Sequence, residues 1–250
     1  MIDRAVRLSR YLPLILLAAL WEALTRLGVV SDLVLPPFTS VMASWFTLAE
    51  NGTMFYHIGT SLIRGASGLG LAIAVGTTLG VLMAWVAPIR VVFRPLVQMF
   101  YPVPKSALIP LMMIWIGVGD ASKIVVIFLG CMLPVTMSAF NGARGVDRVL
   151  IWSARSLGAT RGEVLCEVIA PAALPDILAG IRTALALSFL LLVSSELLIS
   201  RNGVGYLISN YGDAGIYTSM FAMVLTVSAL GFAADRLYLA FMNRILAWRQ

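Results

Sequence analysis

Three long stretches of this chain carry no charged residue, and they limit its fold more than any other feature. They lie between Arg64 and Arg90, between Lys123 and Arg144, and between Asp213 and Asp235, and each contains at least 20 residues. A helix of about 20 apolar residues spans the hydrocarbon core of a bilayer. Charged residues make up only 12% of the chain, whereas a typical soluble domain has about 25%. The chain is therefore predicted to be an integral membrane protein.

The hydropathy pattern predicts one all-α transmembrane domain, residues 1–250, with about six spans. These spans are expected at about 12–30, 66–87, 95–117, 124–140, 177–199 and 217–240. The first span follows three arginines, as the apolar part of a signal peptide does, but no small-residue cleavage pattern ends it. We therefore expect it to remain in the protein. Glu22, Thr25 and Arg26 make it the least apolar of the six.

The distribution of Lys and Arg predicts that both termini are cytoplasmic. With the N-terminus inside, segments 1–11, 88–94, 141–175 and 241–250 are cytoplasmic. The outer segments then contain only two basic residues, Lys123 and Arg201. The basic residues of the cytoplasmic segments are Arg4, Arg7, Arg10, Arg90, Arg94, Arg144, Arg148, Arg155, Arg161, Arg244 and Arg249. This bias explains the net charge of +6 without a nucleic-acid partner.

Two spans have features that predict how they pack. The second carries small residues at intervals of four, which allow another helix to approach closely. These residues are Ala72, Gly76, Gly80 and Ala84. The third contains Pro95, Pro102, Pro104 and Pro110, so we expect it to be kinked or partly unwound and to lie inside the bundle.

The segment from 141 to 175 is too polar to span a membrane and predicts a cytoplasmic helical hairpin at 147–171. A short helix is expected at 149–157, with Gly158 as its terminator. Thr160 and Glu163 have the spacing of a capping box that opens a second helix. Pro171 and Pro175 are expected to stop that helix before the fifth span begins.

The sequence of this hairpin resembles a known family. The run ARSLGATRGEVLCEVIAPAALP, from Ala154 to Pro175, is similar to the cytoplasmic signature loop of binding-protein-dependent ABC importer permeases. The glycine and the proline of that signature fall on Gly158 and Pro171. Trp152 stands where the family has Glu, and Ser153 and Ala170 are two further departures. The resemblance therefore implies no carboxylate contact from position 152.

Three other segments resemble the branch of the family that imports nitrate, sulfonates, taurine and related small molecules. They are YPVPKSALIPLMMIWIGVGDASK at 101–123, GVGYLI at 203–208, and Leu35-Pro36-Pro37 in the first outer loop. The resemblance implies a five-helix permease core with one additional N-terminal helix, in the bacterial inner membrane. It also implies three kinds of partner: two cytoplasmic ATPase subunits, a periplasmic or lipid-tethered substrate-binding protein, and a second permease copy.

The resemblance implies a transport subunit and not an enzyme. The chain has no G-x-x-x-x-G-K-[ST] phosphate-binding loop, so ATP and Mg²⁺ are expected on the partner ATPase, with no cofactor bound here. The hairpin is expected to couple the chain to that ATPase, although a free loop is the alternative. The residues assigned to coupling are Arg148, Leu150, Ile151, Ala154, Arg155, Leu157, Gly158, Ala159, Arg161, Glu163 and Pro171; Val164 and Leu165 are further apolar candidates for the docking surface.

A translocation route is predicted along the third and fifth spans. Ionisable residues inside spans are costly and usually face the interior or a pathway. The candidates are Lys105, Arg182, Phe189, Leu192, Ser195 and Glu196. Arg182 and Glu196 lie on one helix stripe but are too far apart to pair, and Lys105 could equally pair with a carboxylate. The other basic residues near span ends, Arg26, Arg64 and Arg236, are interpreted as interfacial anchors.

Two other functional classes remain. A secondary transporter or channel would act alone, but such carriers usually hold carboxylates near mid-membrane, and the candidate acids here lie towards span ends. A membrane-embedded enzyme would need a catalytic or metal-binding set. The one histidine, His57, is placed in an outer segment without Cys or carboxylate partners at metal-ligand spacing, so no metal site is expected.

Overall fold

The computed structural model describes residues 12–198 and 200–249, and in this part of the chain it is helical without any β-strand. The all-α prediction is confirmed. Arg4, Arg7 and Arg10, on which the N-terminal orientation partly rests, lie outside the described residues. In chain order the helices are α2 (Leu12–Arg26), α3 (Phe38–Glu50), α4 (Thr53–Trp85), α5 (Ala87–Phe100), η1 (Lys105–Ala107), α6 (Leu108–Ile116), α7 (Asp120–Gly145), α8 (Arg148–Ser156), α9 (Arg161–Glu163), η2 (Val164–Ile169), α10 (Ala170–Leu198), α11 (Val204–Asp213), α12 (Tyr217–Ile245) and η3 (Ala247–Arg249).

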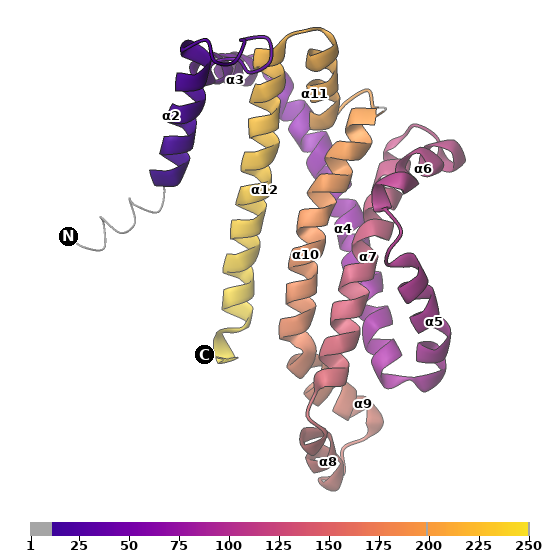
Figure 1. The fold of residues 1–250 in the computed structure, drawn as a ribbon. Helices are drawn as coiled ribbons and strands as arrows, with labels where there is room; N and C mark the ends of the chain where they lie inside the picture. Colours follow the sequence, from indigo (N-terminus) through magenta and orange to yellow (C-terminus); the bar gives the residue numbers. More distant parts are fainter. Residues whose placement is uncertain (1–11, 199, 250) are drawn as a thin grey trace, which may run out of the picture.

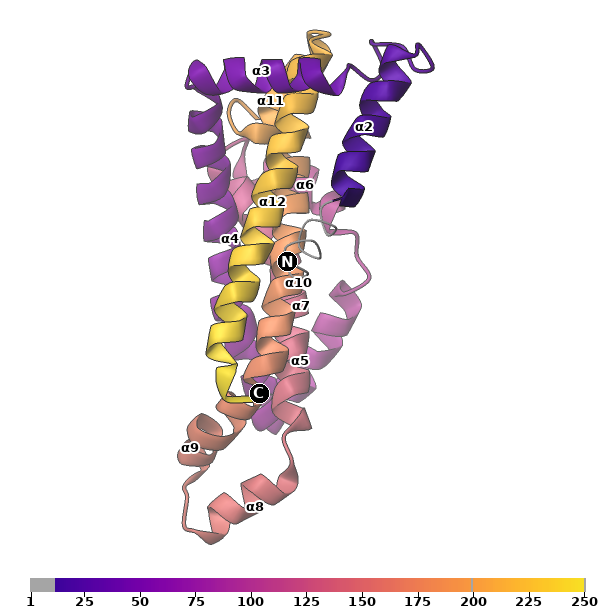
Figure 2. The ribbon, with the colours of Figure 1, turned by 90° about the vertical axis from the view of Figure 1, so that its left-hand side faces the viewer.

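The long helices α4, α7 and α10 lie side by side as the centre of the bundle, and α12 flanks α10 (Figure 1). Helix α3 crosses one end of the bundle and joins α2 to α4 (Figure 2). Helices α8 and α9 project from the opposite end, where α5 begins and α12 finishes. We call these two ends the α3 end and the α8 end.

Four described helices are long and apolar enough to cross a membrane: α4, α7, α12 and the continuous helix Arg161–Leu198. A fifth span results if α5 and the helices after its break are counted as one. The first predicted span corresponds to α2. This helix has 15 described residues, fewer than the roughly 20 that a membrane-spanning helix needs. The Glu22 carboxylate of α2 accepts a hydrogen bond from the Thr39 backbone N–H at 3.1 Å, which attaches α2 to α3.

The third predicted span is broken at its prolines, as expected. Helix α5 ends at Phe100, and the helical segment Lys105–Ile116 continues at 87° to it. Pro102 and Pro104 lie in the break because proline cannot donate a backbone hydrogen bond. The Lys105 ammonium donates to the carbonyl oxygens of Phe100 at 3.1 Å and Val103 at 2.7 Å, and also to that of Tyr101. These bonds satisfy backbone groups that the break leaves without helical partners.

The predicted helical hairpin differs from its prediction at its second helix. Asp147 caps α8 by accepting from the Val149 N–H at 2.9 Å, and Thr160 and Glu163 form the expected capping box. The expectation that Pro171 and Pro175 stop the second helix is wrong, because the helix continues to Leu198. Val164–Ile169 form a π-helix that ends two residues before Pro171. Such a local widening accommodates the missing proline N–H without ending the helix.

Helices α4 and α7 form the most extensive contact in the bundle, and the small-residue ridge of α4 explains it. A Cβ atom added at Gly76 would lie 3.0 Å from the Met132 carbonyl oxygen, and one at Gly80 would lie 2.6 Å from Ala139 Cβ. Both neighbours belong to α7. Glycine at these positions therefore sets the distance between the two helix axes, which confirms the predicted packing role.

We predict that Gly80→Leu destabilises the bundle, because a leucine there must displace the α7 backbone. Overpacking of this kind costs about 1–3 kcal/mol, and thermal unfolding in detergent should show a lower midpoint. Gly70→Leu is the matched control, since Gly70 is on the same helix with nothing within 4 Å of an added Cβ. Equal unfolding midpoints for the two variants would show that the close contact of α4 with α7 at Gly80 does not determine the helix packing.

Candidate functional site

A cluster of charged and polar side chains lies at the α3 end of the bundle, with Ser61, Arg64 and Glu196 buried and Asp120 largely exposed. We call it the polar cluster; it consists of Ser61 and Arg64 of α4, Asp120 of α7, Glu196 of α10, and Asn202. Arg64 is only 2% exposed. Its Nη1 donates to Glu196 Oε1 at 2.7 Å, and its Nε donates to Asp120 Oδ1 at 2.8 Å. The same guanidinium donates to the backbone and side-chain oxygens of Asn202. One side chain thus ties three helices and a loop together.

Glu196 extends the polar cluster to the start of α11. Its carboxylate is 1% exposed, accepts from the Ser61 hydroxyl at 2.8 Å and accepts from the Gly205 N–H at 3.0 Å. Ser61 in turn accepts from the Val204 N–H at 2.8 Å. A negative charge at a helix N-terminus is favourable because the first N–H groups of α11 point towards it. A Cβ on Gly203 would collide with this carboxylate, and its φ of +111° also favours glycine.

His57, which the sequence places in an outer segment, lies beside the polar cluster near the start of α4. Its Nδ1 accepts from the Gly203 N–H at 2.9 Å, and its ring stacks on Tyr206 with the centroids 5.8 Å apart. In the described part of the chain, no group of three His, Cys, Asp or Glu side chains is arranged to hold a metal ion. The arrangement is a hydrogen-bonded support for the segment before α11.

The residues predicted to line a translocation route lie in three separate places. Phe189, Leu192 and Glu196 border a cavity of only about 10 Å³ beside Ser61. The Ser195 hydroxyl is buried and donates to the Leu192 carbonyl at 2.8 Å. Arg182 is exposed and pairs with Asp235 of α12 at 2.8 Å. Lys105 lies at the break after α5, where its stem approaches Gly130 of α7.

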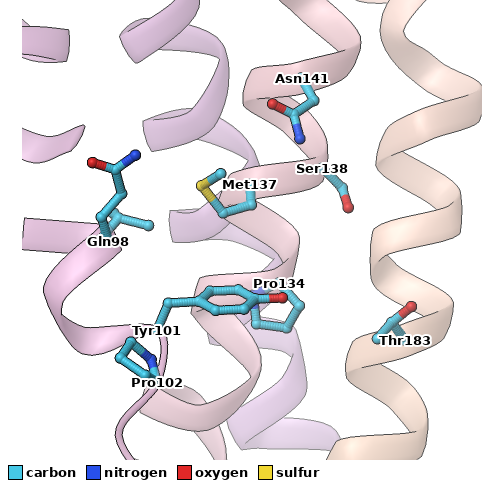
Figure 3. Close-up of a pocket in the computed structure, with 9 residues that line it drawn as sticks. Gln98, Tyr101, Pro102, Pro134, Met137, Ser138, Asn141 and Thr183 are labelled. Atoms are coloured by element: carbon cyan, nitrogen blue, oxygen red, sulfur yellow. The ribbon is translucent and has the colours of Figure 1, made fainter. Parts of the chain in front are cut away.

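A larger pocket opens between α5, α7 and α10, with a volume of about 460 Å³ (Figure 3). Five side chains with hydrogen-bonding groups surround it, together with apolar residues and two prolines. The lining residues are Val97, Gln98, Tyr101, Pro102, Pro134, Met137, Ser138, Asn141 and Thr183. Figure 3 shows the Tyr101 ring extending across the pocket towards Pro134. No ionisable carboxylate or basic side chain lines it. We call it the neutral pocket.

Helix α8 presents a mixed surface at its end of the bundle. Ile151, Ala154 and Ala159 pack against the core, whereas Trp152 is 62% exposed and Leu157 is 89% exposed. The remaining candidates for coupling are exposed as well: Arg148, Leu150, Arg155, Gly158, Arg161, Glu163 and Pro171. Val164, considered as an apolar contact for a partner, is instead fully buried. The π-helix at Val164–Ile169 places that side chain in the core.

Sequence reasoning missed two of these features for different reasons. Arg64 was interpreted as an interfacial anchor because it precedes the apolar run, but α4 begins at Thr53, well before that run, and carries Arg64 into the bundle. If the second span is extended back to Thr53, Arg64 lies inside it, and a charged residue inside a span indicates a buried partner or a functional site. The neutral pocket gives no such signal, because Gln98, Ser138 and Thr183 are ordinary helix residues until three helices bring them together.

Comparison with known proteins places these features in context. A family model described as "Binding-protein-dependent transport system inner membrane component" matches residues 76–247. The taurine transport system permease protein of Escherichia coli K12 is 34% identical over 99% of this chain and 91% of its own length. A putative aliphatic sulfonates transport permease protein of Bacillus subtilis 168 is 35% identical over 95% of this chain and 86% of its own.

Solved structures agree on the fold. A chain of an inward-facing methionine ABC transporter superposes with a TM-score of 0.62 at 19% identity, covering 74% of this chain and 93% of that one. A chain of an amino acid ABC transporter also gives 0.62, at 14% identity and 79% and 94% coverage. At these identities the similarity concerns the helical architecture alone.

We predict that Arg64→Met destabilises the protein, because it leaves the Glu196 carboxylate buried without its cation. Breaking a buried ion pair typically costs about 3–5 kcal/mol, which chemical unfolding in detergent can measure. Arg64→Met combined with Glu196→Leu should recover part of the loss. Arg182→Met is the control, since its pair with Asp235 lies at the surface and should contribute little. The interpretation fails if Arg64→Met is as stable as Arg182→Met.

Proposed function

The chain belongs to the family of binding-protein-dependent transport system inner membrane components, and from that premise we propose that its ATP-driven importer carries a small sulfonate such as taurine. The observation that carries this proposal is the pair of relatives named for taurine and aliphatic sulfonates, which align with almost the whole chain. The transported solute would be delivered by a periplasmic or lipid-tethered binding protein.

We propose that the α8 end faces the cytoplasm. Basic residues concentrate at this end, and Lys and Arg are enriched in cytoplasmic loops of membrane proteins. They are Arg90, Arg94, Arg144, Arg148, Arg155, Arg161 and Arg244. This orientation puts α3 and the polar cluster at the outer face. It supports a cytoplasmic C-terminus, and the same bias supports a cytoplasmic N-terminus.

Helix α8 is the proposed docking element for the ATPase. Leu150 and Trp152 of α8 and Leu157 directly after it are exposed apolar side chains, and Arg148 and Arg155 are exposed on the same helix. Exposed apolar side chains within a charged surround are typical of interaction sites. The buried half of α8 packs on the core, so movement of a docked partner would be transmitted to α7 and α10 through Ile151 and Ala154. ATP and Mg²⁺ would bind the ATPase and not this chain.

We propose that two copies of the chain, each with one ATPase, enclose the translocation route along α5 and α10. The support is chemical: polar residues in spanning helices usually face an interior or a pathway, and the neutral pocket gathers such residues between α5, α7 and α10. Lys105, at the break of α5, would raise the local concentration of an anion. Glu196, beside α11, would hold the outer end closed until the binding protein arrives. Along α10, Phe189, Leu192, Ser195 and Arg182 would border the route once it opens.

A secondary transporter that acts alone is the competing function. Such carriers use carboxylates that bind and release ions or protons within the membrane. Glu196 is held by Arg64, and Asp235 is held by Arg182. Both carboxylates therefore have structural partners, which favours the subunit of an ATP-driven system.

We predict that Gly158→Val disrupts coupling, because Gly158 has a φ of +91° that a β-branched residue adopts only with strain. The variant should insert in the membrane at the normal level but lose co-purification with its ATPase and lose sulfonate uptake. Gly162→Val is the matched control, since Gly162 lies four residues later with ordinary helical φ and nothing within 4 Å of an added Cβ. Normal complex formation and uptake by Gly158→Val would exclude this turn from the coupling surface.

A further inference from the structure

Helix α12 carries an exposed arginine on a side that is otherwise apolar. Of the four candidate spans among the described residues, α12 is the least buried. It lies on the far side of α10 from α5 (Figure 1), away from the proposed contact between two copies. Arg236 is exposed on this helix, and its neighbours Phe232 and Leu237 are 55% and 72% exposed. This side of α12 therefore faces lipid, with a cation among its apolar residues.

The position of Arg236 along α12 places it inside the hydrocarbon core. Arg236 lies nine residues before Ile245, roughly 13 Å along the helix axis. The 29 residues of α12 extend over roughly 43 Å, whereas the hydrocarbon core is about 30 Å thick. Trp248, which is 61% exposed just beyond this end, is of the residue type that marks the membrane–water interface. With α12 centred in the core, the Arg236 backbone lies roughly 7 Å within the edge at the α8 end.

The side chain of Arg236 points away from the nearer membrane surface. Helix geometry tilts each side chain towards the N-terminus of its helix, and α12 begins at the α3 end. In agreement, the guanidinium carbon of Arg236 lies 4.9 Å from the centroid of the Phe232 ring, one turn nearer the α3 end. An arginine near the end of a span usually extends its charge to the surface instead. The charge of Arg236 is thus held deeper than its backbone.

No carboxylate in the described part of the chain pairs with Arg236. Its neighbour Asp235 accepts from Arg182 of α10 with both oxygens, at 2.8 and 3.1 Å. None of the ion pairs between described side chains includes Arg236 or Arg244. Stacking on Phe232 uses the face of the guanidinium, so its five N–H donors remain available in the plane. Such donors are costly in hydrocarbon without acceptors, and an anion with several oxygens satisfies both the charge and the donors.

We propose that Arg236 binds the phosphate group of an anionic phospholipid in the leaflet at the α8 end. A guanidinium donates two parallel hydrogen bonds to a phosphate, and Phe232 and Leu237 supply apolar contacts for an acyl chain. Arg244 is exposed two turns nearer the helix end and adds a second positive charge at the headgroup level. An acidic headgroup therefore fits better than a zwitterionic one. The proposed orientation makes this leaflet cytoplasmic, and the rest of the inference is independent of the proposed transport function.

The test measures the phospholipid bound by the full chain in detergent. Native mass spectrometry counts bound lipids during titration with phosphatidylglycerol or with phosphatidylcholine of the same acyl chains. The wild type should bind phosphatidylglycerol more tightly. Arg236→Met removes the charge and keeps an unbranched side chain. It should weaken the tightest binding of phosphatidylglycerol roughly 10- to 100-fold, the range for losing hydrogen bonds to a charged group, and leave that of phosphatidylcholine unchanged.

Arg94→Met is the matched control. Arg94 is an exposed arginine of α5, seven residues after Ala87 at the α8 end, so its depth is similar to that of Arg236. Because α5 runs in the opposite direction to α12, helix geometry tilts Arg94 towards the nearer surface. The control should leave the tightest binding unchanged. Equal losses for the two variants would mean a general attraction to basic residues and would overturn the assignment to Arg236.

Two further variants keep the proposal falsifiable if Arg236→Met fails to fold. Phe232→Leu keeps an apolar residue at an exposed position and removes the ring that holds the guanidinium. Arg236→Lys keeps the charge but cannot form the paired hydrogen bonds. Both should weaken phosphatidylglycerol binding by a smaller factor than Arg236→Met, and unchanged binding in both would contradict the proposal. Excess soluble glycerol phosphate should not displace the lipid; displacement would indicate a site for a free anion.

The remaining outcomes are distinct. If the wild type binds phosphatidylglycerol and phosphatidylcholine equally, α12 has no anionic lipid site. If Arg236→Met changes the oligomeric mass of the chain and leaves its bound lipid unchanged, Arg236 faces a second copy and the proposal is wrong. The measurement requires no ATPase, binding protein or sulfonate. Failure of the lipid site therefore leaves the proposed transport function standing, and failure of taurine import leaves the lipid site standing.

Discussion

The buried guanidinium of Arg64 is the interaction on which the arrangement of the helices most depends. It binds carboxylates from α7 and α10 and the loop before α11. Arg64 and Glu196 are both buried, and an unpaired charge at this depth would cost several kcal/mol, so each of these two is needed for the other to remain buried. Because Glu196 also accepts from the start of α11, the polar cluster fixes the α3 end of the bundle as one unit.

The opposite half of the molecule is organised by close backbone packing rather than by charge. Gly76 and Gly80 bring α4 against α7, and Gly180 brings α10 against α7 at Ser138. With these contacts on one side, the break after Phe100 leaves α5 as the remaining wall of the neutral pocket. The bundle thus has an ion-paired end at α3 and a pocket in the half nearer α8.

Much of the fold could be predicted from the sequence, because bilayer spanning imposes strong local signals. The glycine ridge of α4, the proline break at 101–104 and the capping box of Thr160 and Glu163 all depend on nearby residues. The continuation of the helix through Pro171 could not be predicted, because it depends on a π-helix that local rules do not specify. The polar cluster depends on pairing between Arg64 and Glu196, which are 132 residues apart. The coupling and pathway assignments remain predictions.

We propose that the chain transports only as part of an ATP-driven complex. The most direct measurement is taurine accumulation in proteoliposomes that contain the chain alone or the complete complex, with ATP or with imposed proton and sodium gradients. If the claim is right, accumulation requires the ATPase, the binding protein and ATP together, and the gradients have no effect. Accumulation by the chain alone in response to an ion gradient would contradict it.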